Sequence, residues 1–152
     1  MFQICDAIFT DTVPVYIKNT GDGFFATFSN PGACLEAALT ILKRLAARNR
    51  VTQSRPIDVR MGLHYGEMFL IDEETHDRHG NDLNIAFRVE GVSEAAFEDG
   101  LVEKLPDKNR IVATSVFFDM RVPKDAPFKR LGKANLKGIK EPVELYIYTG
   151  NI

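Results

Sequence analysis

The chain carries the turn sequence Lys18-Asn19-Thr20-Gly21-Asp22-Gly23 between two stretches that resemble strands. Residues 13–18 alternate between apolar and other side chains, and residues 24–28 form a second apolar run. Asp-Gly between two such runs is a strong hairpin signal, because both turn positions favour a positive φ. The stretch therefore predicts an antiparallel hairpin with Asp22-Gly23 at its tip.

The residues around this hairpin mix helical and extended patterns. A helix is predicted after Asn30-Pro31, a capping residue followed by a proline that suits the first turn. Its apolar stripe is formed by Cys34, Ala38, Ile41, Leu42 and Leu45. Further helices are expected at 2–13, 81–96 and 115–120, and strands at 57–64, 68–71, 111–113, 128–131 and 143–148, with 72–80 a loop or strand end and 97–109 irregular. This mixture predicts an α+β sandwich in which helices cover one sheet.

Length and composition set outer limits on the function. The 152 residues correspond to one domain with 45% apolar and 26% charged residues, as in an ordinary soluble protein. A net charge of −2 without a basic stripe argues against a nucleic-acid binder. We expect no membrane segment and no signal peptide. Cys5 and Cys34 fit reduced core thiols, so the cytoplasm is the expected location.

Asp22 is the first candidate for chemistry. A carboxylate held on a tight turn suits a hard cation such as Mg²⁺, but turn chemistry alone also explains Asp22-Gly23. Lys18 and Asp77 have an equally ordinary interpretation as solvated charges. His76 and His79 could suggest a metal pair, but no cysteine or third histidine lies near them in the sequence.

Asn84 and Arg88 are four residues apart on the predicted helix and therefore point in the same direction. Small residues, Gly91 and Ala95, share this face, which leaves room for a ligand or a partner subunit. An ordinary polar helix surface is the alternative. Taken singly, Arg60 and Lys137 are uninformative.

Collectively these residues resemble the catalytic domain of the class III nucleotidyl cyclases. That family has a lysine before Gly-Asp in a hairpin, an Arg-x-Gly-x-His-x-Gly strand, an aspartate before Gly-Asn, Asn-x-x-x-Arg on a helix and a C-terminal Leu-Lys-Gly. The chain contains the corresponding elements in the same order: Lys18 before Gly21-Asp22, Arg60 through Gly66, Asp77 before Gly80-Asn81, Asn84 through Arg88, and Leu136-Lys137-Gly138.

The resemblance implies a ferredoxin-like (βαββαβ) cyclase sandwich that converts ATP to cyclic AMP and pyrophosphate with two Mg²⁺ or Mn²⁺ ions. Catalysis would take place at a dimer interface, with substrate contacts from one subunit and metal aspartates from the other. In this interpretation Lys18 and Asp77 bind the adenine base and Asn84 positions the ribose. Arg88 stabilises the charge of the transition state, and Lys137 binds the phosphates, with Arg60 as a further candidate. Asp22 binds the metal.

One departure from the family pattern concerns the second metal aspartate. In the family it lies on a first strand that precedes the helix with which this sequence begins. Asp6 and Asp11 lack that strand-and-turn context. The resemblance therefore predicts a domain that lacks the first strand and has impaired activity, and it leaves open a full-length cyclase partner in place of a homodimer.

Three interpretations of the function follow. The first is an adenylate cyclase domain. The second is a non-catalytic domain that binds nucleotide or dimerises as a regulator. The third is an unrelated α+β binding module in which the shared motifs are coincidental.

Overall fold

The computed structural model describes residues 14–67, 69–72, 77–79, 81–120 and 123–152. They form two compact units. The described part of the first comprises residues 14–59, 123–124 and Ile152, and the second comprises the described residues of Arg60–Met120 and Asp125–Asn151. The helix predicted at 2–13 lies outside the described residues. The mixed α+β composition is confirmed.

The predicted hairpin is present in the first unit. Strands β1 (Tyr16–Asn19) and β2 (Phe24–Thr27) pair antiparallel, with Asn19 opposite Phe24. Across the loop, the Thr20 amide donates to the Gly23 carbonyl at 3.0 Å, and the Gly21 amide donates to Asn19 Oδ1 at 2.8 Å. Positive φ occurs at Gly21 (+97°) and not at Asp22 or Gly23, so the expected two-residue turn is corrected to a four-residue loop.

Helix α2 (Pro31–Val51) begins as predicted. Asn30 Oδ1 accepts the Ala33 amide at 2.8 Å, which satisfies one of the unpaired donors of the first turn. The buried stripe consists of Leu35, Ala37, Ala38, Ile41, Leu42 and Leu45. Near the last turn, the side chain of Asn49 exchanges two hydrogen bonds with the backbone of Ile57, which holds the loop that follows the helix.

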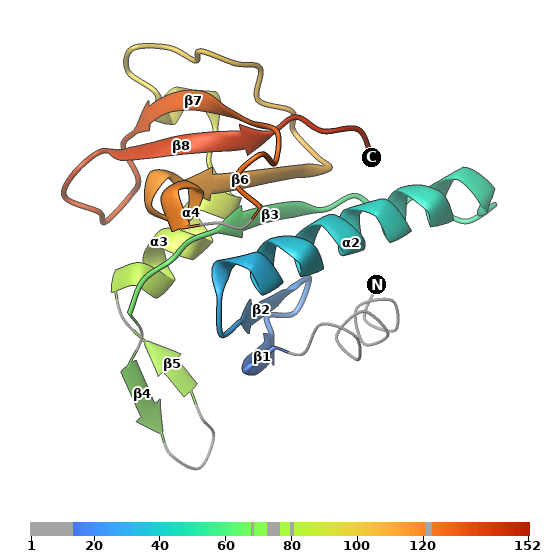
Figure 1. Ribbon diagram of the computed structural model, residues 1–152, viewed down its shortest axis with the longest axis horizontal. Coiled ribbons are helices and arrows are strands. Elements are labelled where there is room, and N and C mark those ends of the chain that lie inside the picture. The colour runs from blue at the N-terminus through green and yellow to red at the C-terminus, as the bar shows by residue number, and fades with distance from the viewer. Residues whose placement is uncertain (1–13, 68, 73–76, 80, 121–122) are drawn as a thin grey trace. The chain divides into compact units, whose positions relative to one another are not determined.

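The second unit is built on a four-stranded sheet in the order β3-β6-β8-β7 (Figure 1). These strands are β3 (Arg60–Leu63), β6 (Arg110–Thr114), β8 (Val143–Tyr148) and β7 (Phe128–Ala134). Strand β3 runs parallel to β6, and the other neighbours are antiparallel. Helix α3 (Asn81–Glu90) lies in the connection from β3 to β6 and packs on both strands, whereas the short helix α4 (Ser115–Met120) packs on β6 and β8.

One core cluster joins α3 to the sheet. Ile85 and Val89 of α3 are buried with Val112 of β6 and with Leu145 and Ile147 of β8. The segment predicted to be irregular also contributes to this cluster, because Phe97 and Leu105 are buried in it. The face of α3 that contacts the sheet is therefore fixed by its apolar side chains.

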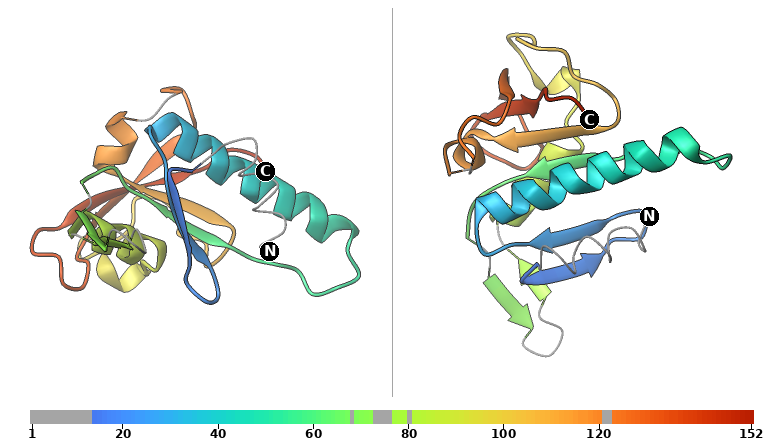
Figure 2. Two further views of the ribbon diagram at one scale, coloured as in Figure 1. Left: turned by 90° about the horizontal axis from the view of Figure 1, so that it is seen from below. Right: turned by 45° about the vertical axis from the view of Figure 1, so that its right-hand side comes forward.

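Two predicted elements differ in the structure. The strand expected at 68–71 is β4 (Phe69–Asp72), which pairs with β5 (Asp77–His79) as a separate two-stranded hairpin. This hairpin extends away from the four-stranded sheet in Figure 1 and in the right-hand view of Figure 2. The helix expected at 81–96 ends at Glu90, and a single 3₁₀ turn, η1 (Glu94–Ala96), follows. None of the helices in the described ranges has the length and apolar character needed to cross a bilayer.

Candidate functional site

Asn84 and Arg88 lie one turn apart on the outer face of α3, as predicted. Both side chains are exposed, and Phe87 beside them is 46% exposed. Ile85 and Val89, on the opposite side of the helix, are buried in the core cluster. The helix therefore presents an amide, a guanidinium and an aromatic ring together, on a face that a nucleotide or a second subunit can reach.

The position of α3 is set by its close approach to β3. A Cβ on Gly62 would lie 2.7 Å from the Ala86 carbonyl oxygen and 2.5 Å from the Glu90 amide nitrogen. Gly62 and His64 are two residues apart, so both side-chain positions lie on the same face of the extended chain, the one that meets α3. Alternation in residues 57–64 predicts a polar strand face that carries Arg60, Gly62 and His64. In the structure, α3 covers this face at Gly62 and His64.

His64, which directly follows β3, connects β6 and α3 on this face through two hydrogen bonds. Its imidazole is 7% exposed, with Nε2 2.7 Å from Asp82 Oδ1 and Nδ1 2.8 Å from Thr114 Oγ1. Asp82 lies in the first turn of α3, and Thr114 is the last residue of β6. The sequence did not predict that Asp82 and Thr114 meet His64, because this contact depends on the tertiary fold.

Arg110 is a second buried polar residue that the sequence did not single out. Its guanidinium donates to the carbonyls of Pro106 (2.9 Å), Glu90 (3.1 Å) and Val92 (2.6 Å). The bonds to Glu90 and Val92 hold the C-terminal end of α3, where the last carbonyls of a helix have no partner within the helix. Burial, together with the nearby Arg60 charge, lowers the pKa of Arg110 from its ordinary value.

Arg60 and Lys137 lie elsewhere in the second unit. Arg60 Nε is 3.0 Å from Glu90 Oε1, so this predicted phosphate contact has an ion-pair partner at the end of α3. Lys137 is exposed between β7 and β8, directly after Leu136, which is anchored in the core. The Leu136-Lys137-Gly138 motif thus combines a buried anchor with an accessible ammonium group.

The remaining predicted site residues lie on the two hairpins. Lys18 is exposed on β1, opposite Phe25, and Asp22 is exposed in the loop that follows. Asp77 begins β5, where it pairs with Asp72 of β4. Asn84, Arg88, Arg60, Lys137 and Asp77 therefore belong to the second unit, whereas Lys18 and Asp22 belong to the first.

A carboxylate such as Asp22 is the donor type that Mg²⁺ and Mn²⁺ prefer. Within the described ranges, no three His, Cys, Asp or Glu side chains are close enough together to hold a metal ion. Asp22, exposed in the loop between β1 and β2, can supply one oxygen ligand to such an ion.

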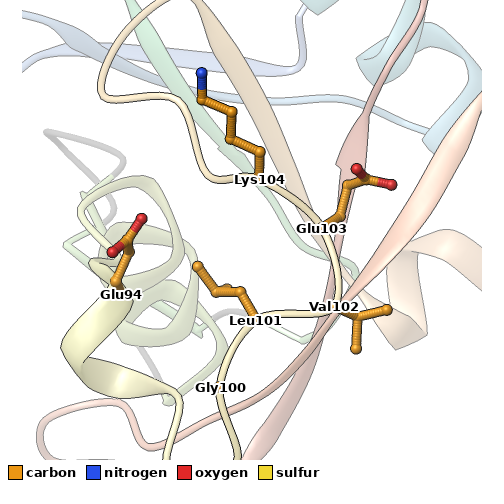
Figure 3. A pocket seen from close by; sticks show the side chains of 6 residues that line it. All are labelled: Glu94, Gly100, Leu101, Val102, Glu103 and Lys104. Carbon is orange, nitrogen blue, oxygen red and sulfur yellow. The ribbon is translucent and has the colours of Figure 1, made fainter.

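The second unit also contains a hollow. It measures about 550 Å³ and is lined by Glu94 and by residues 100–104 (Figure 3). Glu103 at its rim is paired with Lys129 at 3.4 Å. None of the site residues predicted from the sequence lines it, so we do not assign the substrate to this hollow.

No protein-family model matches the chain, and no curated protein matches it. Several solved structures, however, are similar to the chain. An adenylate/guanylate cyclase/hydrolase from Silicibacter pomeroyi has a TM-score of 0.77 at 23% identity, over 98% of this chain and 78% of that one. The guanylate cyclase domain of RhGC from Catenaria anguillulae, in complex with GTP, has a TM-score of 0.70 at 17% identity, over 99% and 80%.

The adenylyl cyclase CyaB from P. aeruginosa has a TM-score of 0.69 at 17% identity, over 99% of this chain and 79% of that one. At these identities the likeness concerns the fold. The chain has the α+β fold of adenylate and guanylate cyclase catalytic domains.

Proposed function

We propose that the chain is a nucleotidyl cyclase domain that converts ATP to cyclic AMP and pyrophosphate. The observation that carries the proposal is the exposed pair Asn84 and Arg88 on α3, within a fold shared with adenylate and guanylate cyclases. In the reaction the ribose 3′-oxygen forms a bond to the α-phosphorus and the bond from that phosphorus to the β-phosphate oxygen breaks. Pyrophosphate leaves, and the hydroxyl proton passes to water.

Arg88 is assigned to the α-phosphate. A guanidinium carries fixed donors and a permanent charge, and it stabilises a transition state when it is aimed at oxygens on which negative charge increases. Asn84, one turn earlier on the same face, is assigned to the ribose, because an amide can both donate to and accept from hydroxyl groups. Lys137 is assigned to the terminal phosphates, with Arg60 as a further candidate.

Adenine is the proposed base because of the chemistry of Lys18 and Asp77. Adenine presents a ring nitrogen that accepts a hydrogen bond beside an amine that donates one. A lysine donor and an aspartate acceptor match this pair. Solved neighbours of the fold include both adenylate and guanylate cyclases, so the preference rests on these two side chains.

Asp22 is the proposed ligand of the divalent ions, Mg²⁺ or Mn²⁺. When bound, such ions make the 3′-hydroxyl more acidic and neutralise charge on the phosphates. We further propose that two copies of the chain share each site, one contributing Asp22 and the other contributing Asn84 and Arg88. In a two-fold dimer each copy then contributes to two sites.

Complementation tests both the reaction and the shared site. Asp22→Asn and Arg88→Ala variants, each alone, are expected to lose cyclic AMP formation from ATP with Mn²⁺. Mixing them should restore up to about a quarter of the parent rate, because about half of the dimers are mixed and each of those keeps one intact site. An Arg130→Ala variant, altered at an exposed arginine on β7, is the matched control and should keep the parent rate.

Each other outcome has a definite meaning. Recovery that fails despite an active parent would place the whole site within one chain. A parent that binds ATP through Lys18 but forms no cyclic AMP would support the non-catalytic regulatory alternative. A parent that does not bind ATP would reject the nucleotide site.

A further inference from the structure

The inner side of α3 is joined to the sheet by a continuous chain of hydrogen bonds. His64 lies at its centre, between Asp82 Oδ1 at 2.7 Å and Thr114 Oγ1 at 2.8 Å. The chain continues at both ends, since Thr114 Oγ1 accepts the Phe117 amide at 3.3 Å and Asp82 Oδ2 accepts the Glu67 amide at 3.0 Å. It therefore runs from α4 through the last residue of β6 and His64, which directly follows β3, to the first turn of α3.

The direction of each bond follows from the groups involved. An ionised carboxylate only accepts, so His64 must donate from Nε2 to Asp82. In the neutral imidazole Nδ1 then accepts, and the Thr114 hydroxyl donates to it while accepting from the Phe117 amide. Every donor in the chain has an acceptor, and the arrangement selects one imidazole tautomer.

The Asp82 carboxylate is held sterically as well. A Cβ on Gly66 would lie 2.5 Å from Asp82 Oδ1 and 2.7 Å from Asp82 Cβ. Only a glycine at position 66 leaves space for this side chain. The Asp82 side chain is 34% exposed, but its carboxylate accepts two hydrogen bonds and lies against the backbone of Gly66, which together fix its orientation.

Asp82 is the second residue of α3, two positions before Asn84 and six before Arg88. Each residue of an α-helix advances 100° around the axis, so a rotation at the first turn swings every outward side chain by the same angle. We propose, building on the function proposed above, that His64 is a positioning residue. Through Asp82 it fixes the rotation of α3 and so aims Asn84 and Arg88 at the substrate.

The test compares variants that break the chain with one that keeps it. Asp82→Asn cannot accept from both His64 and Glu67, and Thr114→Val removes the hydroxyl at nearly constant shape. Thr114→Ser retains it. We expect the two breaking variants to lower kcat about 10- to 100-fold with little change in KM for ATP, since misaligned catalytic groups cost rate more than binding. Thr114→Ser should keep the parent kcat.

A combined variant separates orientation of the two side chains from simple stability. If Asp82 acts by orienting Asn84 and Arg88, then adding Asp82→Asn to a chain that already carries Asn84→Ala and Arg88→Ala should cause little further loss of the residual kcat, because both groups to be oriented are already absent. Multiplied losses in the combined variant would overturn the proposal. So would breaking variants that keep the parent kcat, or that lose it only in proportion to the unfolded fraction measured by circular dichroism.

A spectroscopic measurement decides the inference independently of turnover. In ¹⁵N-histidine-labelled protein at pH 8, with the His64 signal assigned by its loss in His64→Gln, the Nε2–H tautomer is expected. The Nδ1–H tautomer would overturn the proposal.

A parent without cyclase activity would instead overturn the proposed function, and amide exchange would then serve as the readout. Faster exchange at Asn84 and Arg88 in Asp82→Asn is expected, and unchanged exchange would refute the positioning role.

Discussion

Gly62 of β3 lies directly against the backbone of α3 at Ala86, with room for a hydrogen but not for a methyl group. A Cβ at Gly62 would stand 2.7 Å from the Ala86 carbonyl oxygen. Gly62→Ala should therefore push α3 away from the sheet and lower the free energy of unfolding by about 1–3 kcal/mol, the usual cost of overpacking. Urea denaturation followed by circular dichroism measures the change.

Gly91→Ala is the control for this prediction. Its Cβ would meet the Phe87 carbonyl oxygen at 3.9 Å, an ordinary contact. The variant should match or slightly exceed the parent stability, because alanine reduces the entropy of the unfolded chain. Similar losses in both variants would contradict the close approach of β3 to α3.

Arg110 carries the second prediction. It is 4% exposed and binds three carbonyls around the end of α3. Arg110→Met should leave these acceptors unsatisfied and lower the free energy of unfolding by about 2–4 kcal/mol, because each buried orphaned acceptor costs energy. Denaturation midpoints, with unchanged slopes, measure the loss.

The same experiment includes an exposed arginine. Arg130 forms an ion pair with Glu144 on the surface of the sheet, where solvent screens the interaction. Arg130→Ala should therefore change the midpoint far less than Arg110→Met. Equal effects would mean that Arg110 does not support the end of the helix.

The features predicted well from the sequence are those set by neighbouring residues. Asn30 caps α2 because its side chain reaches an amide three residues away, and Asn84 and Arg88 share a face because helical periodicity is local. The end of α3 was placed too late, since Arg110, which caps Glu90, is twenty residues further along. No local pattern carries that information.

The β3 motif shows a different limit. Alternation correctly separated Leu63 from the polar positions, and Leu63 is buried. It could not reveal that Gly62 and His64 contact a helix, because the partners Ala86 and Asp82 come from another element. Alternation was also insufficient at β1. The apolar residues Val15 and Ile17 of that pattern are 63% and 46% exposed, so an apolar strand position is not always a buried one.

Cys34 gives a prediction about pH. Burial raises the pKa of its thiol from 9.0 to about 12. Above pH 9 the unfolded chain loses the thiol proton while the folded chain retains it, so the unfolded state binds fewer protons and the free energy of unfolding falls as the pH rises. The fall reaches at most about 1.4 kcal/mol per pH unit between these two values.

A Cys34→Val variant isolates this contribution from other groups that titrate at high pH. Both chains carry Cys5→Ser, so that Cys34 is the only thiol to compare. The free energy of unfolding of the chain that keeps Cys34, minus that of the Cys34→Val variant, should decrease as the pH rises from 8 to 10. Iodoacetamide should also label the native thiol slowly at pH 9. A pH-independent difference, or rapid native labelling, would show that the thiol is exposed to solvent.

The last prediction concerns the base that Lys18 and Asp77 select. Lys18→Glu replaces a donor with an acceptor, which is mismatched with the ring nitrogen of adenine but suits the N–H groups on the corresponding edge of guanine. The ratio of kcat/KM for ATP to that for GTP should fall at least about tenfold, because an unpaired polar group in a binding site discriminates strongly. Lys18→Met serves as the matched control. It removes the donor without adding an acceptor, so it should lower kcat/KM for ATP without raising kcat/KM for GTP. If Lys18→Glu and Lys18→Met alter the ratio equally, Lys18 contributes charge to the phosphates and does not read the base.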